Sequence, residues 1–200
     1  MKKSLSLSII VFLVMGLAAC SRPIDGVQSA AQGPPIKWAE TDTVQLLDFR
    51  EALELFEEGT YAEVYDIEMG LTFHVKRTTG GYNTLADVEP LTKQDTETIL
   101  KIAGGDWNLN RRAVILTIEG VRIAASITPF PHFGCDDHPH GVFVDNRNGS
   151  TGPGINLNSI RDNGMTGVVD IYFFNSRMPG INRVDEAHQA MVLRAYEHEN

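Results

Sequence analysis

The sequence predicts an α+β fold, in which an antiparallel sheet built from hairpins carries helices near both ends of the domain. Two pairs of apolar runs alternate with polar residues, and a glycine-containing turn joins the runs of each pair. Such pairs are typical of β-hairpins. Apolar residues at helical spacing precede the first pair and follow the last strand. Paired strands with helices at the ends indicate the α+β class.

The first helix is predicted to begin at Asp48 and to end before Gly59. Its apolar residues recur at helical spacing, at Phe49, Leu53 and Phe56. Alternating runs over 62–67 and 71–76 follow, with Gly70 in the turn between them. These two runs form the first predicted hairpin.

A second helix is predicted from Thr92, because Thr92 and Asp95 match a capping box with Asp in place of the usual Glu or Gln. It is expected to end at Gly104. Runs over 113–118 and 121–127 then predict the second hairpin.

The last third of the chain combines a long polar stretch with two further elements. Residues 168–174 predict a strand and residues 185–197 a final helix. Residues 128–166 are rich in Pro, Gly, Asn and Asp and predict a long polar loop. A loop of this length in a compact domain is usually functional or conceals a missed element.

The first residues have the layout of a bacterial export signal. Lys2 and Lys3 precede a short apolar run, which is typical of a signal peptide. The run ends in Leu-Ala-Ala-Cys at residues 17–20, and this motif resembles the lipobox of bacterial lipoproteins. The resemblance implies that residues 1–19 are removed and that Cys20 carries lipid. Residues 20–43 then read as a flexible tether, and residues 44–200 as a single globular domain.

The charge of the chain disfavours nucleic acid as a partner. Residues 1–19 contain two of the 17 Lys and Arg residues and none of the 26 Asp and Glu residues, so their removal changes the net charge from −9 to −11. Binding to nucleic acid needs a basic face that displaces counterions. We therefore expect an acidic, extracytoplasmic protein held at the membrane by its lipid and not by surface charge.

The stretch PFPHFGCDDHPHG, residues 129–141, concentrates potential ligands and nucleophiles. His132, His138, His140 and Cys135 are residue types that bind zinc. A polar loop without a metal is the favoured interpretation, and a zinc site is the alternative. Thiol catalysis by Cys135 is the weakest option, since the aspartates beside it oppose thiolate formation.

Other polar residues are weaker candidates. Asp87 and Glu89 lie two apart, which would place both carboxylates on one side of an extended segment. A solvated turn before the second helix is nevertheless the favoured interpretation of that stretch. Asp185 and His188 are expected to play a surface or core role, and Trp107 is equally a core residue or a platform for a sugar.

Six segments in order resemble an uncharacterised domain of exported bacterial proteins, which often accompanies peptidoglycan-binding modules. They are ADVEPLT, GGDWNLNRRAV, RIAASITPFPH, NGMTG, FFNSR and NRVDEAHQAMV, and they span about residues 61–196. The resemblance implies a role at the cell wall. At six positions this chain has the polar residue that is typical of the family, namely Asp87, Glu89, His132, Arg177, Asp185 and His188.

The chain departs from that family at the positions that would supply ligands or nucleophiles. Family members have His or Cys where this chain has Leu85, Val168, Asp170, Tyr172 and Pro179. We therefore expect a domain without catalysis or cofactor that binds peptidoglycan, other wall material or an envelope protein; no catalytic residue is assigned. The alternative is a metal-dependent hydrolase of peptidoglycan peptides. Its candidate ligands are Asp87, His132, His138 and His140, and Asp170 offers a rearranged site together with the 132–140 loop.

Overall fold

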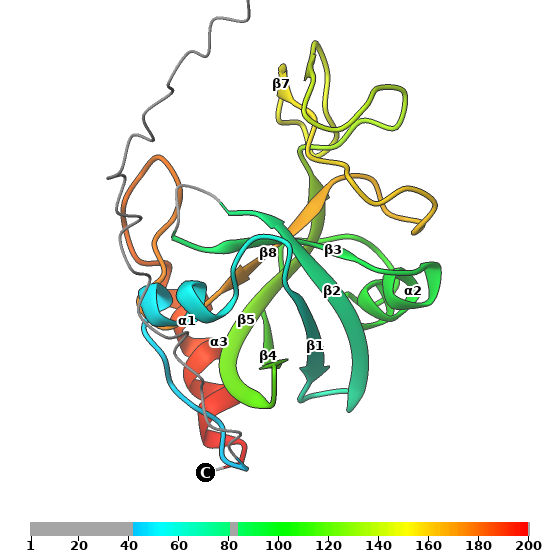
Figure 1. The fold of residues 1–200 in the computed structure, drawn as a ribbon. Helices are drawn as coiled ribbons and strands as arrows, with labels where there is room; N and C mark the ends of the chain where they lie inside the picture. The colour runs from blue at the N-terminus through cyan, green and yellow to red at the C-terminus, as the bar shows by residue number, and fades with distance from the viewer. Residues whose placement is uncertain (1–41, 81–83, 200) are drawn as a thin grey trace, which may run out of the picture. The chain divides into compact units, whose positions relative to one another are not determined.

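Six antiparallel strands close into a barrel in the computed structural model of the chain, which describes residues 42–80 and 84–199 (Figure 1). The described residues all belong to one compact unit, Lys37–Asn200. The order around the barrel is β1-β2-β3-β8-β5-β4, and β4 pairs back on β1. The bounds are β1 Tyr61–Asp66, β2 Leu71–Thr79, β3 Ala86–Pro90, β4 Arg112–Ile118, β5 Val121–His132 and β8 Val168–Tyr172. The α+β class and the antiparallel sheet are confirmed.

Three helices and a small second sheet accompany the barrel in the described ranges. The helices are α1 (Phe49–Leu55), α2 (Lys93–Ile102) and α3 (Glu186–Glu197). The second sheet pairs β6 (Phe143–Val144) with β7 (Gly154–Ile155). Local sequence explains where the helices start, since side chains of the preceding residues accept hydrogen bonds from the first turn of each helix. These capping residues are Asp48, Thr92 and Asp185.

Alternation along the strands separates a barrel interior from an outer face. Inward side chains form one apolar cluster that includes Val64, Phe73, Val88, Leu116, Ile127 and Ile171. Full burial of each such side chain stabilises the fold by about 1.5–3 kcal/mol. A second cluster lies between α3 and the outer face of β4 and β5, and it consists of Val44, Ala113, Ile115, Ala124, Val192 and Ala195. α3 therefore covers one part of the outer wall.

Two sequence predictions need correction. β5 continues to His132, so the long loop starts at Phe133 and not at 128. Asp87 and Glu89 lie in the fully buried strand β3 and not in a solvated turn. The short run between the first hairpin and α2 becomes a strand because β2 and β8 pair with its two edges.

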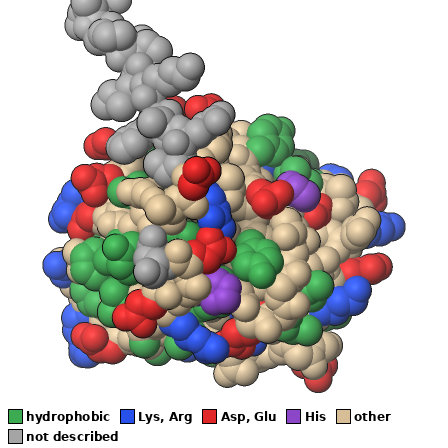
Figure 2. Space-filling model, turned by 90° about the horizontal axis from the view of Figure 1, so that it is seen from below, with side chains coloured by type: hydrophobic (Ala, Val, Ile, Leu, Met, Phe, Trp, Pro, Cys, Tyr) green, Lys and Arg blue, Asp and Glu red, His purple; other side chains and the backbone are tan. Residues whose placement is uncertain are grey.

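Within the described part of the chain, no helix is long and apolar enough to cross a membrane. The predicted leader, Cys20 and the tether up to residue 41 lie outside the described residues. On the face shown in Figure 2, basic and acidic side chains are interspersed, so that face presents charges of both signs and not a continuous field of one sign.

Candidate metal centre

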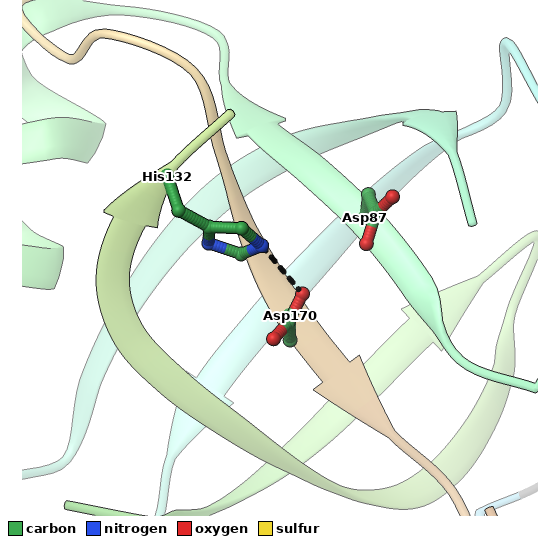
Figure 3. Close-up of side chains that lie close together, drawn as sticks. All are labelled: Asp87, His132 and Asp170. Atoms are coloured by element: carbon green, nitrogen blue, oxygen red, sulfur yellow. Dashed lines mark ion pairs between the residues drawn. The ribbon is translucent and has the colours of Figure 1, made fainter. Parts of the chain in front are cut away.

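Asp87, His132 and Asp170 meet on the outer face of the barrel (Figure 3). They come from β3, β5 and β8, and β8 lies between the other two strands. Each offers one ligand atom, and these atoms all lie within 4.8 Å of one another. Nε2 of His132 lies 3.3 Å from Oδ1 of Asp170. Three neighbouring strands thus bring together residues far apart in sequence.

Strand register places the two carboxylates side by side. Asp87 pairs with Asp170 across β3 and β8, and Asp170 pairs with Thr128 across β8 and β5. The chain neighbours of both aspartates, such as Val88 and Ile171, point into the core. Because side chains alternate along a strand, both aspartates face outward.

A bulge in β5 brings His132 to the same place. The pairing of β5 with β8 shifts between Thr128 and His132. Pro129 and Pro131 lie in this interval, and proline has no N–H to donate to a sheet ladder. The extra residues bend the strand end, and the imidazole reaches Asp170 from there.

The charges in the cluster are strongly coupled. Burial and the neighbouring Asp170 carboxylate raise the pKa of Asp87 to about 8, so Asp87 is mainly protonated at neutral pH. Burial opposes protonation of His132, but the hydrogen bond and charge of Asp170 outweigh it and raise the pKa of His132. The cluster therefore holds protons where a cation would also fit.

The orientation of the His132 ring favours ligation. Its Nδ1 lies 3.0 Å from the carbonyl oxygen of Phe130, so an Nδ1–H donates to that carbonyl. This arrangement leaves Nε2 directed at Asp170 and able to carry the lone pair. Histidines that bind metal usually donate their second ring N–H to a carbonyl or carboxylate in this way.

The donor set fits a divalent metal ion. In a tetrahedral zinc site with ligands at about 2.0–2.1 Å, neighbouring ligand atoms lie roughly 3.3 Å apart. The observed separation between His132 and Asp170 is 3.3 Å. Asp170 is partly exposed, whereas Asp87 is buried, so an ion would be reached from the Asp170 side. The cluster could hold a metal through three protein ligands.

The structure does not bring the other loop candidates to this cluster. His138 and His140 are exposed. Across residues 42–80 and 84–199, the one group with metal-ligand spacing includes neither of them, nor Cys135. The thiol sulfur of Cys135 lies 3.4 Å from Nδ1 of His138, in a contact separate from the metal cluster.

Glu89 and Arg177 serve local structure. The fully buried Glu89 carboxylate accepts hydrogen bonds from the backbone N–H groups of Ser159 and Ile160, at 2.8–3.1 Å, and from the Ser159 hydroxyl. It therefore anchors the loop that precedes β8. Arg177 donates to the carbonyl of Asn182 at 3.0 Å within its own loop.

Asp185 and His188 belong to a second polar cluster beside β5. Asp185 caps α3 and accepts a hydrogen bond from Arg111 at 2.8 Å. The His188 ring lies 2.8 Å from the Ser126 hydroxyl and 3.0 Å from the Thr128 hydroxyl. It stacks on Tyr172, with ring centroids 3.7 Å apart. Burial lowers the pKa of His188 to about 4, so the ring is neutral.

Sequence reasoning missed the two hydroxyl residues of this second cluster. Ser126 and Thr128 are alternate residues on the outer face of β5, opposite the inward Ala125 and Ile127. The sequence did contain a signal for this cluster, since two hydroxyl residues alternate along an otherwise apolar strand. A hydroxyl buried under a helix needs a hydrogen-bond partner, so a polar residue of the covering helix could have been expected beside them.

Comparisons with protein-family models, with curated proteins and with solved structures find no match for this chain. The convergence of Asp87, His132 and Asp170 therefore carries the functional interpretation, together with the export-like start of the sequence.

Proposed function

We propose that this chain is a lipid-anchored envelope protein whose barrel domain binds a divalent metal ion, preferentially zinc, through Asp87, His132 and Asp170. The observation that carries the proposal is the convergence of their three ligand atoms within 4.8 Å on one outer face. The hydrogen bond from His132 to the Phe130 carbonyl supports it, since that bond presets the ring for ligation.

Electrostatics also favour a cation at this position. Two carboxylates in one partly buried site repel each other, and burial penalises their charged forms. Asp87 avoids this penalty by keeping its proton, as its raised pKa indicates. A divalent ion would replace the protons on Asp87 and His132 and neutralise both carboxylates. Imidazole and carboxylate oxygen together suit zinc better than magnesium or calcium.

The start of the sequence supports an extracytoplasmic location. Residues 1–19 have the layout of a signal peptide, and Cys20 is at the position where bacterial lipoproteins are lipidated. Acyl chains contribute about 0.8 kcal/mol per buried CH₂, so two or more of them hold a protein at a bilayer. Peptidoglycan, other wall material or an envelope protein is the partner that this location and the family resemblance favour.

Binding without turnover fits the cluster better than catalysis. Asp87, His132 and Asp170 are themselves the ligands, so within the cluster no carboxylate or imidazole remains as a separate base. His188, which lies on α3 and packs against β5, has both ring nitrogens engaged by Ser126 and Thr128. We therefore assign the domain a metal-stabilised binding role and no catalytic residue.

Hydrolysis of peptide bonds in peptidoglycan is the second candidate. The favouring observation is that three protein ligands leave a fourth position of a tetrahedral ion open, on the side where Asp170 is 23% exposed. A metal bound there would polarise an amide carbonyl and lower the pKa of its bound water to about 7. Release of peptides from purified wall fragments by the zinc-loaded chain would favour this candidate over binding alone.

Metal analysis of the full chain, purified in detergent with added zinc and then dialysed, tests the proposal. We expect one equivalent of zinc in the parent chain. The His138→Ala, His140→Ala double variant is the matched control, because it removes two exposed loop histidines and should keep the ion. The Asp87→Asn variant should lose it. An ion that depends on His138 and His140, or no ion in the parent, would contradict the proposal.

A further inference from the structure

Two adjoining pockets lie beside the metal cluster, and we call them together the loop groove. One has a volume of about 540 Å³ and is walled by Trp107, Phe130 and Pro131. The other has a volume of about 310 Å³ and includes Lys93 and Arg161. Both are lined by the shared residues Asp136, Gly164, Met165 and Thr166, so the two pockets adjoin.

The loop groove and the cluster share a wall. Gly149 lines the larger pocket, and a Cβ added to it would lie 2.6 Å from Cβ of His132. Phe130 and Pro131 line the same pocket and immediately precede His132 along β5. A molecule in the larger pocket would therefore lie against the strand end that carries His132.

The larger pocket has the composition of a sugar site. Trp107 is half-buried and packs on the barrel core, which fixes its position. No hydrogen bond joins its indole N–H to any residue that the structure describes, so this donor is available to a ligand. An aromatic ring offers a flat apolar face together with a polar edge. Pyranose rings have apolar C–H faces bordered by hydroxyls, and this surface complements that of an indole.

Asp136 adds acceptors at the boundary between the two pockets. Its side chain is 66% exposed. It accepts hydrogen bonds from Asn158, at 2.7 Å, and from the Thr166 hydroxyl, at 2.5 Å. A carboxylate has about four lone-pair sites, so further acceptor capacity remains for hydroxyl groups of a ligand.

The smaller pocket carries charges of both signs, with Lys93 and Arg161 together with Asp136 and Asp162 among its lining residues. Lys93 is exposed, and it forms no ion pair with any of the described residues. Arg161 donates to the backbone carbonyls of Asp136, at 2.8 Å, and of His138, which hold its guanidinium in place. Arg161 also lies 4.0 Å from the Asp136 carboxylate. Lys93 is therefore the cation of this pocket that can pair with a negative group on a ligand, and the aromatic wall of the adjoining pocket suits a ligand that joins such a group to a sugar ring.

We propose that the loop groove binds a saccharide that carries a carboxylate group. The sugar ring lies against Trp107, its hydroxyls donate to Asp136, and the carboxylate pairs with Lys93. This site goes beyond the proposed metal centre, and its occupancy does not require the ion. Muramic-acid glycans with attached peptide and uronic-acid glycans share this chemistry, so the experiment includes both sources.

Titration calorimetry of the full chain, in a detergent without a sugar headgroup, tests the proposal with three probes. These are a disaccharide muropeptide, an oligogalacturonide and the neutral sugar chitotetraose. We expect binding of the muropeptide, the oligogalacturonide or both, and weaker binding of chitotetraose. Muropeptide binding alone identifies wall glycan as the source. Absence of binding by both carboxylated probes, or equal binding of the neutral sugar, would overturn the proposal.

Substitutions of residues that line the loop groove test whether the saccharide binds there. Trp107→Ala should weaken binding of the carboxylated probe by about tenfold or more, the scale of a buried aromatic contact. Lys93→Glu, at an exposed position that leaves the fold intact, should weaken it by about two- to fivefold. The matched controls Phe143→Ala and Lys101→Glu should bind as the parent does. Equal effects of variants and controls would overturn the assignment to the loop groove.

The metal centre and the loop groove are separable in the same assay. Asp170→Asn should abolish zinc binding and leave saccharide affinity within about twofold, since Asp170 does not line either pocket. Saccharide binding without zinc binding supports the groove alone. Zinc binding without saccharide binding contradicts the groove and leaves the proposed function standing.

Discussion

Asp87 and Asp170 are direct partners across β3 and β8, and both carboxylates face the outside of the barrel. Like charges directly opposite each other on a sheet are destabilising. Burial and this neighbour raise the pKa of Asp87 to about 8. Two buried carboxylates that repel each other are stabilised by a proton or a cation between them. His132 completes a set of three ligands for a cation.

Zinc affinity should depend steeply on pH. Both the carboxylate of Asp87 and Nε2 of His132 must lose a proton before they can coordinate. Because the pKa of each is raised in the metal-free chain, binding near pH 7 should release protons. Calorimetric titrations in two buffers of different ionisation enthalpy measure this release. An enthalpy that does not change with the buffer would argue against these two ligands.

Replacement of one ligand should lower zinc affinity sharply. For Asp170→Asn we expect a loss of about 100-fold or more, because an amide oxygen carries no charge to neutralise the ion; loss of groups that merely support a ligand already costs roughly 10–100-fold. Competition with a zinc-binding dye measures the affinity. Asp145→Asn makes the same change at an exposed position and should have no effect. Equal affinities of parent and Asp170→Asn would remove Asp170 from the site.

His188 should make the domain sensitive to mild acid. Burial lowers its folded-state pKa to about 4, below the unfolded value of about 6.5. Its stabilising contribution is therefore complete above pH 6.5 and is lost as the pH falls toward 4. The loss should amount to roughly 3 kcal/mol in the free energy of unfolding.

Urea unfolding of the metal-free chain between pH 4 and 7 measures this effect. The His188→Gln variant should be less stable at pH 7, because it loses the stacking on Tyr172, but its stability should vary much less over this interval. Parallel pH profiles of parent and variant would show that other groups are responsible.

Glu89 should be important for stability and not for metal binding. Its carboxylate receives the backbone N–H groups of Ser159 and Ile160 inside the protein. Glu89→Gln places an amide donor against these N–H groups, and we expect a loss of about 2–4 kcal/mol in the free energy of unfolding. Glu97→Gln, on the exposed side of α2, is the matched control. Thermal unfolding with zinc present and absent should show the same destabilisation if Glu89 has no part in the metal site.

Lipid attachment at Cys20 is tested on cells that express the full chain. Cys20→Ser should move the protein from the membrane fraction to a soluble fraction, since no thiol remains for the acyl chains. Intact mass spectrometry of the parent should show a lipid-sized increment on a chain that starts at Cys20. A parent chain without that increment would remove the lipoprotein assignment.

Local signals in the sequence predict local structure well. Thr92 and Asp95 form their capping box because both partners lie within one helical turn. Alternation in β5 marks Ile123, Ala125 and Ile127 as inward residues. Barrel closure was not predictable in this way, because the pairing of Asp87 with Asp170 joins residues more than 80 positions apart through register alone.

The metal cluster was only partly predictable for the same reason. Asp87 and His132 stood among the candidate ligands, but Asp170 entered only as part of a rearranged site. Pro129 and Pro131 made the end of β5 read as loop, since prolines usually mark turns. In the folded chain they lie at the bulge that brings His132 to β8. Nearness in sequence favoured His138 and His140, which remain exposed on the loop.

The most direct measurement is anomalous diffraction at the zinc absorption edge from crystals of the zinc-loaded chain. One anomalous peak should lie about 2.0–2.2 Å from a carboxylate oxygen of Asp87, a carboxylate oxygen of Asp170 and Nε2 of His132. A peak between His138 and His140, or none on the outer face of β3, β8 and β5, would contradict the metal centre.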